Sequence, residues 1–132
     1  MSFSDYLENK VLGYAFGGAS WTAPTSLSVA LYSAAPSDSG GGTELSGSGY
    51  ARVSITTLAT NMTVSGTSPT QVVNTNNVDF AAASGTWATA THAAIFDNSG
   101  NMLDWGALTT SKTLTLGDVF RFAAGALKVT LD

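Results

Sequence analysis

The segment from residue 26 to residue 53 places the strongest constraint on the fold. Leu27, Val29 and Leu31 alternate with smaller residues, which is the pattern of a strand with one buried face. A polar, glycine-rich stretch follows, and the chain becomes strand-like again at Tyr50–Val53. Because a long loop of small residues between two strands is typical of a contact surface on a rigid scaffold, this segment predicts a β scaffold that carries an interaction loop.

The chain after Trp21 repeats this alternation of short apolar runs and turn residues. Asp97–Gly100 and Gly117–Asp118 predict tight connections between strands. The predicted strands are Ser26–Ser33, Tyr50–Thr57, Gln71–Phe80, Thr86–Phe96, Asn101–Leu108, Lys112–Leu116, Val119–Phe122 and Leu127–Leu131. Short strands with regular turns predict an all-β fold, an antiparallel jelly-roll-like sandwich. Its core is expected to include Val53, Ile55, Phe96, Trp105, Phe120, Phe122 and Val129.

The N-terminal region predicts one short helix, the only one expected in the chain. Ser2 or Ser4 can cap it, and Asp5 lies in the first turn, where the helix dipole favours a carboxylate. Apolar residues recur at helical spacing, and Gly17 follows as a stop signal. The length of 132 residues fits a single domain, residues 1–132, in which residues 1–18 form a helix and arm.

Charge is sparse, and its distribution argues against several classes of partner. The chain has five Lys and Arg residues, nine Asp and Glu residues and a net charge of −4, with no basic stripe, so no nucleic-acid partner is expected. The apolar runs are too short to cross a membrane, and no secretory signal is expected. The absence of cysteine excludes a disulfide framework and a thiolate zinc site.

No catalytic, cofactor or metal site is predicted, and we expect the chain not to be an enzyme. His92, the only histidine, lies within a predicted strand, and the chain has no G-x-S-x-G nucleophile elbow of the kind found in serine hydrolases. Asp104, next to Trp105, is the most suggestive carboxylate for glycoside hydrolysis, but no partner carboxylate is singled out. The Asp97–Asn101 segment resembles a calcium loop only superficially, and a hairpin turn explains it better.

Four segments carry a resemblance to a known family. They read MSFSDYLENKVL, VALYSAAPSDSGGGTELSGSGYARV, HAAIFDNSGNML and WGALTTSKTLTLGDVFRFAAGALKV. The chain resembles short bacteriophage virion proteins that are labelled tail-fibre-like or capsid cement (decoration) proteins. The most specific pieces are the loop GGGTELSGSGYAR and the terminal GDVFRFAAGALKVTLD.

The resemblance, together with the sparse charge and the glycine-rich loop, favours a structural role in a virion. We expect a cement protein, made in the host cytoplasm, that binds the capsid exterior and bridges subunits of the major capsid protein. Self-association as a dimer or trimer is also expected. The alternative is a tail-fibre or receptor-binding accessory protein that could bind carbohydrate, and a polysaccharide-degrading enzyme is the third option.

Contacts with partners are expected from the helix and from the loop. The candidate contact residues are Tyr6, Tyr14, Trp21, Ser39, Gly41, Thr43 and Glu44. Since long surface loops tolerate change, deletion of residues 37–48 is expected to leave the domain folded while weakening attachment.

Overall fold

A computed structural model describes residues 1–131 and shows an all-β fold built from antiparallel sheets. The largest sheet has six strands in the order β1-β9-β8-β2-β3, and β4 also pairs with β2. Their bounds are β1 (Ser2–Phe3), β9 (Met102–Lys112), β8 (Ala90–Asp97), β2 (Leu27–Ala34), β3 (Thr43–Glu44) and β4 (Val53–Ile55). The central strand β2 confirms the predicted alternation, because Val29 and Leu31 belong to the main core while Ala30 and Tyr32 pack on the opposite face.

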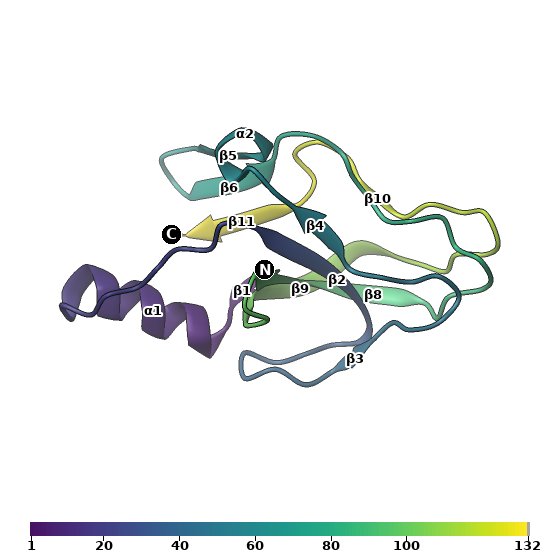
Figure 1. Cartoon of the computed structure of the whole chain (residues 1–132), viewed down its shortest axis with the longest axis horizontal. Helices are drawn as coiled ribbons and strands as arrows, with labels where there is room; N and C mark the ends of the chain where they lie inside the picture. Colours follow the sequence, from purple (N-terminus) through teal and green to yellow (C-terminus); the bar gives the residue numbers. More distant parts are fainter. Residues whose placement is uncertain (132) are drawn as a thin grey trace.

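Two smaller sheets form the second layer over the large sheet (Figure 1). One contains β5 (Met62–Ser65), β6 (Thr70–Asn74) and β11 (Lys128–Leu131), and the other pairs β7 (Val78–Asp79) with β10 (Arg121–Phe122). The core between the layers contains Trp87, Leu114 and Leu127, which are almost completely buried. The protein is therefore an antiparallel β sandwich, as the sequence predicts.

Several elements differ from the predicted ones in number and length. The predicted strand Gln71–Phe80 is divided into β6 and β7. The predicted strand Asn101–Leu108 extends to Lys112 as β9, and the separate strand predicted at Lys112–Leu116 is not formed. The strands β1, β3 and β5 and a single helical turn, α2 (Leu58–Asn61), were not predicted. The strands β1 and β3 have only two residues each, so pairing with a distant strand defines them rather than any local pattern.

The predicted core is correct in four of its seven positions. Those confirmed as buried are Ile55, Phe96, Phe120 and Phe122, whereas Val53, Trp105 and Val129 are only half-buried. Val53 lies on β4, and Val129 lies on β11 at the edge of its sheet, so neighbours cover one side of each residue. Trp105 packs against the outer cluster of the large sheet and donates a hydrogen bond from its Nε1 to Asp38.

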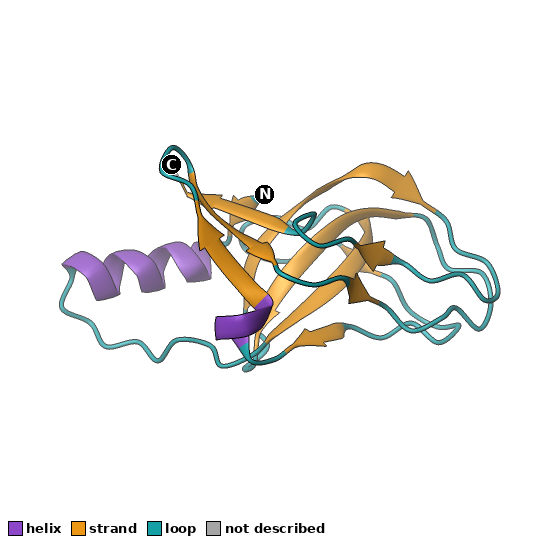
Figure 2. Ribbon diagram, turned by 90° about the horizontal axis from the view of Figure 1, so that it is seen from above, coloured by secondary structure: helices purple, strands orange, loops and turns teal. Residues whose placement is uncertain are grey.

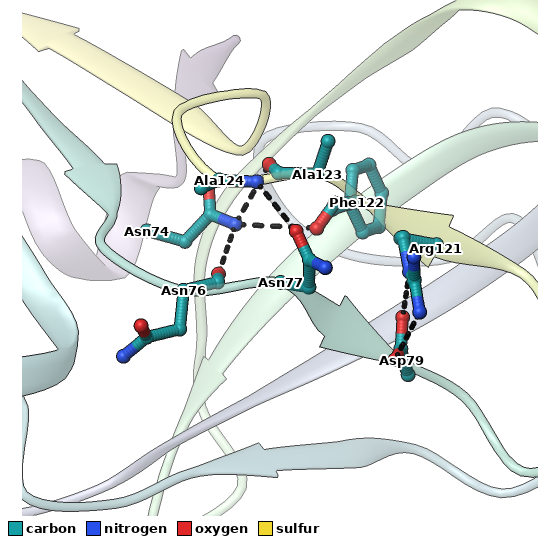
Figure 3. Close-up of polar contacts among 8 residues, drawn as sticks. All are labelled: Asn74, Asn76, Asn77, Asp79, Arg121, Phe122, Ala123 and Ala124. Atoms are coloured by element: carbon teal, nitrogen blue, oxygen red, sulfur yellow. Dashed lines mark hydrogen bonds and ion pairs between the residues drawn. The ribbon is translucent and has the colours of Figure 1, made fainter.

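A buried amide ties β6 to the segment that enters β11 (Figure 3). Asn74, only 1% exposed, donates from its Nδ2 to the carbonyl of Ala123 at 3.0 Å, and its Oδ1 accepts from the N–H of Leu127 at 2.9 Å. Nearby, Arg121 forms a two-pronged ion pair with Asp79 at 2.6 and 2.9 Å. That ion pair is exposed and so stabilises little, whereas the amide satisfies buried backbone groups that would otherwise lack partners.

The helix α1 (Asp5–Phe16) projects away from the sandwich as an arm (Figure 2). Ser4, one of the two predicted candidates, is its cap and accepts a hydrogen bond from the N–H of Leu7. The same hydroxyl donates to the carbonyl of Met102, and the Ser4 N–H donates to Leu103 O at 2.9 Å. The root of the arm is thereby bonded to β9, and α1 itself buries no residue completely.

Candidate functional site

An apolar groove lies between α1 and the sandwich. It has a volume of about 670 Å³ and is lined by side chains of α1, α2 and both layers. Among its lining residues are Leu7, Val11, Leu58, Met62, Val72 and Leu131. A groove of this size and chemistry is typical of a site that receives apolar groups of a ligand or partner.

One carboxylate interrupts the apolar lining of the groove. Asp104, on β9, is the only charged residue that lines it within residues 1–131, and it is 1% exposed. Neither carboxylate oxygen has a hydrogen-bond partner in this described part of the chain. Burial raises the pKa of Asp104 to about 7, and the positive charge of the Met1 amine counteracts this increase only in part.

An unpaired carboxyl group in an apolar site lowers the stability of the fold, so Asp104 is a candidate for contact with a partner. Nearly all buried polar groups in native proteins have a hydrogen-bond partner. A donor supplied from outside the domain would satisfy Asp104 and remove part of this cost. The sequence had singled out Asp104 as a hydrolase candidate, but the described groove offers no second carboxylate beside it.

The predicted contact residues of the arm do not form a single site. Tyr6 and Trp21 line a separate hollow of about 370 Å³ between α1 and the chain that returns from it, and the Lys10 ammonium lies 5.4 Å from the centre of the Tyr6 ring. Tyr14 lies further along the arm and is exposed. Two further exposed apolar residues of α1, Leu12 and Phe16, were not predicted as contacts. Their spacing of four residues was the available signal, since such pairs share one helix face.

The glycine-rich loop is held in place by contacts within the chain. Ser39 and Gly41, both predicted contact residues, are not buried, but residues 37–40 form a tight turn closed by two backbone hydrogen bonds of 2.8 and 2.9 Å. Asp38 accepts hydrogen bonds from the Ser2 hydroxyl at 3.0 Å and from Trp105 Nε1 at 2.8 Å. These contacts place the loop beside the root of the arm.

The remaining predicted contact residues, Thr43 and Glu44, form β3. Glu44 accepts two hydrogen bonds of 2.8 Å from Arg52 and one of 3.0 Å from the Tyr50 hydroxyl. The hydrogen bond from Arg52 is the main reason that the pKa of Glu44 is lowered. The Glu44 carboxylate therefore has internal partners and helps to fix β3 against the neighbouring chain.

The contacts of residues 37–48 argue against the expected tolerance of this loop to deletion. Residues 37–48 include β3, the buried side chain of Leu45 and the carbonyl of Ser48, to which Trp87 donates a hydrogen bond of 2.8 Å. Removing these residues would open the core and leave the indole N–H without its partner.

The other residues weighed for chemistry take structural positions. Asp97 accepts hydrogen bonds from the N–H groups of Ser99 and Asn101 at 2.9 and 2.8 Å, which confirms a hairpin turn. His92 lies in β8, with Nδ1 2.8 Å from the Thr91 hydroxyl oxygen. Across residues 1–131, no group of three or more His, Asp or Glu side chains is arranged to hold a metal ion.

Comparison with known protein families yields a match over nearly the whole chain. A family described as podophage GP4 fiber I protein gp80 matches residues 2–130. The chain belongs to this podophage fibre family. It is therefore a tail-fibre-like structural protein of a phage virion, in agreement with the broader part of the resemblance.

Two further findings accompany this assignment to the podophage fibre family. The curated proteins contain no match to the chain. No helix in the described part of the chain is long and apolar enough to cross a membrane.

Proposed function

We propose that this fibre-family chain is a structural subunit of the phage tail fibre, which binds neighbouring proteins through its arm. The family match over residues 2–130 carries the proposal. The arm supports it, because Tyr14 and Phe16 are exposed on it, while Leu7 and Val11 of the same helix line an apolar groove. Exposed apolar surface of this kind promotes aggregation of a free protein, whereas in an assembly it is buried against a partner.

The same surfaces also fit a capsid cement protein, which is the second candidate function. The loop around Ser39 and the arm are both exposed and both anchored to β9, so they could contact different subunits of the major capsid protein. Binding through several modest contacts on one rigid body gains affinity by multivalency. In both candidate functions the chain acts by binding and has no catalytic step.

The two candidates are separated by the position and number of copies in the virion. We would label the protein with gold-conjugated antibodies in electron micrographs of intact phage and count copies by quantitative mass spectrometry. Label on the tail with a few copies or tens of copies would support a fibre subunit. Label over the head with hundreds of copies would refute it and support the cement function.

A matched functional test compares particles with and without the protein. If the protein cements the capsid, particles that lack it release DNA at a lower temperature, because binding only to the intact lattice stabilises that lattice. If it is a fibre subunit, both particles release DNA at the same temperature, and the particles that lack it adsorb poorly to host cells.

A further inference from the structure

We propose that the groove binds the distal half of α1, residues 11–16, from a second copy of this chain in a reciprocal two-fold exchange. This inference rests on the proposed structural role, because it names the partner of the same arm face. Its test uses the purified protein, so a negative result would overturn the exchange and leave the assignment to a fibre or capsid unchanged.

The arm supplies one half of the contact. Phe16 is 85% exposed and Tyr14 is 62% exposed, and Leu12 is exposed as well. These residues lie in the half of α1 that extends beyond the sandwich (Figure 2). A helix of 12 residues is about 18 Å long, so its tip can reach into a neighbouring molecule while its root stays bonded to β9.

The groove supplies the other half. Its rim includes Val64 and Leu131, two further exposed apolar residues, from the three-stranded sheet. Its opposite wall is formed by Leu7 and Val11 of the molecule's own arm. A second helix placed here would therefore pack against a helix on one side and a sheet on the other, which covers apolar surface on all three elements.

The unpaired carboxyl group identifies the orientation of the second arm. Asp104 lies beside the root of α1, because Phe3 of β1 pairs directly with it. When two helices pack antiparallel, the tip of one lies at the root of the other. The exchange thus brings the Tyr14 hydroxyl of one copy toward Asp104 of the other, where it can donate the missing hydrogen bond once the side chains that cover the carboxylate move aside.

One observation favours a second copy over an unrelated partner. The chain itself carries both an exposed apolar arm and an apolar groove, and a two-fold axis lets each copy fill the groove of the other. Tyr14 is also the better donor from the arm, because the Lys10 ammonium already lies over the ring of Tyr6. The exchange covers Phe16 and satisfies Asp104 at the same time.

Sedimentation equilibrium from about 1 to 100 μM tests the exchange. The expected species is a dimer, with twice the chain mass of 13.5 kDa. Phe16→Ser should shift it to monomer, with Leu116→Ser as the control, since Leu116 is 75% exposed and lies outside the groove lining. A wild-type monomer, a trimer, or a dimer that Phe16→Ser leaves intact would overturn the proposal. Because Phe16 is exposed, its variant is expected to stay folded, which circular dichroism checks.

A double-mutant cycle tests the hydrogen bond. Tyr14→Phe removes only the hydroxyl and should weaken dimerisation by about tenfold, which corresponds to about 1.4 kcal/mol. In an Asp104→Leu background the same change should have no further effect, because the acceptor is absent. Equal effects of Tyr14→Phe in both backgrounds would refute the pairing of these two groups.

Cross-linking gives a direct readout of the geometry, since the chain has no cysteine of its own. An equimolar mixture of Ala15→Cys and Val64→Cys copies should give a mixed dimer with a short bismaleimide. Replacing the Val64→Cys copy with a Leu116→Cys copy should abolish that product. A mixture that cross-links equally through position 116 would contradict the proposed arrangement.

Discussion

Replacing Asp104 by Asn should make the protein less sensitive to pH. In the folded state the pKa of this carboxyl group is raised to about 7, mainly by burial, whereas in the unfolded chain it has its ordinary value near 4. Well below pH 4 the group is protonated in both states, so it contributes no pH dependence to the stability. As the pH rises toward 7, the unfolded chain ionises freely while the folded protein resists, so wild-type stability falls.

The size of this loss follows from the difference between the two pKa values. A pKa difference of about 3 corresponds to about 4 kcal/mol of unfolding free energy, since each pKa unit is worth about 1.36 kcal/mol. This is an upper limit, because Asp104 borders a groove into which water can enter. We expect a loss of about 2–4 kcal/mol between pH 4 and pH 7.5. Asn has no charge to bury and should not show this slope.

Urea unfolding followed by tryptophan fluorescence measures the effect. The Asp104→Asn change should be made in a Phe16→Ser background and compared with Phe16→Ser alone, so that dimerisation does not contribute to the free energy. Taking the difference between the two proteins at each pH cancels the other titrating groups. A stability difference that stays constant within about 0.5 kcal/mol from pH 4 to pH 7.5 would refute the assignment of an unpaired, buried carboxyl group.

Three further changes test the fold by urea unfolding. Phe120→Ala should cost about 3–5 kcal/mol, because this buried ring packs 5.6 Å from Phe80 between their centres; a loss below about 1 kcal/mol would mean that the ring is not part of the core. Asn74→Ala should cost about 2–4 kcal/mol by leaving buried backbone groups unpaired, and a near-neutral effect would contradict that network. Gly42→Ala should destabilise more than Gly41→Ala: both have positive φ, costing about 1–2 kcal/mol, but a Cβ at position 42 alone would meet Pro36 N at 2.7 Å. Equal losses at the two glycines would argue against that close approach.

The parts of the fold that were predictable have local signals. The alternation of Val29 and Leu31 identifies β2 and its inner face, and Ser4 identifies the start of α1. The turn at Asp97 is equally local, because its side chain bonds to the backbone two and four residues ahead. Each of these features depends on interactions within a few residues, which a sequence pattern records directly.

The site was less predictable because it depends on how distant segments pack. The sequence shows Asp104 between two apolar residues, but only the pairing of β1 with β9 and the position of α1 decide that it is buried beneath a groove. The predicted contact residues included Tyr14 and missed Phe16, since a single helix does not reveal which of its apolar faces the sheet will cover. Glu44 was predicted to contact a partner protein because it lies in a polar loop. In the structure its carboxylate instead accepts hydrogen bonds from Arg52, eight residues away in the same chain.

The start of α1 is hydrogen-bonded to β9, and this affects the order in which parts of the protein can fold. Ser2 pairs with Trp105, so the helix acquires its fixed direction only after most of the chain has left the ribosome. Contacts that join such distant residues form late, because closing a long loop costs entropy before the contact repays it. A subunit built in this way presents its arm in a defined direction only once its body has folded. If the arm binds a second copy as proposed, that binding has to wait until the sandwich is complete, so growing chains on the same message would not associate prematurely.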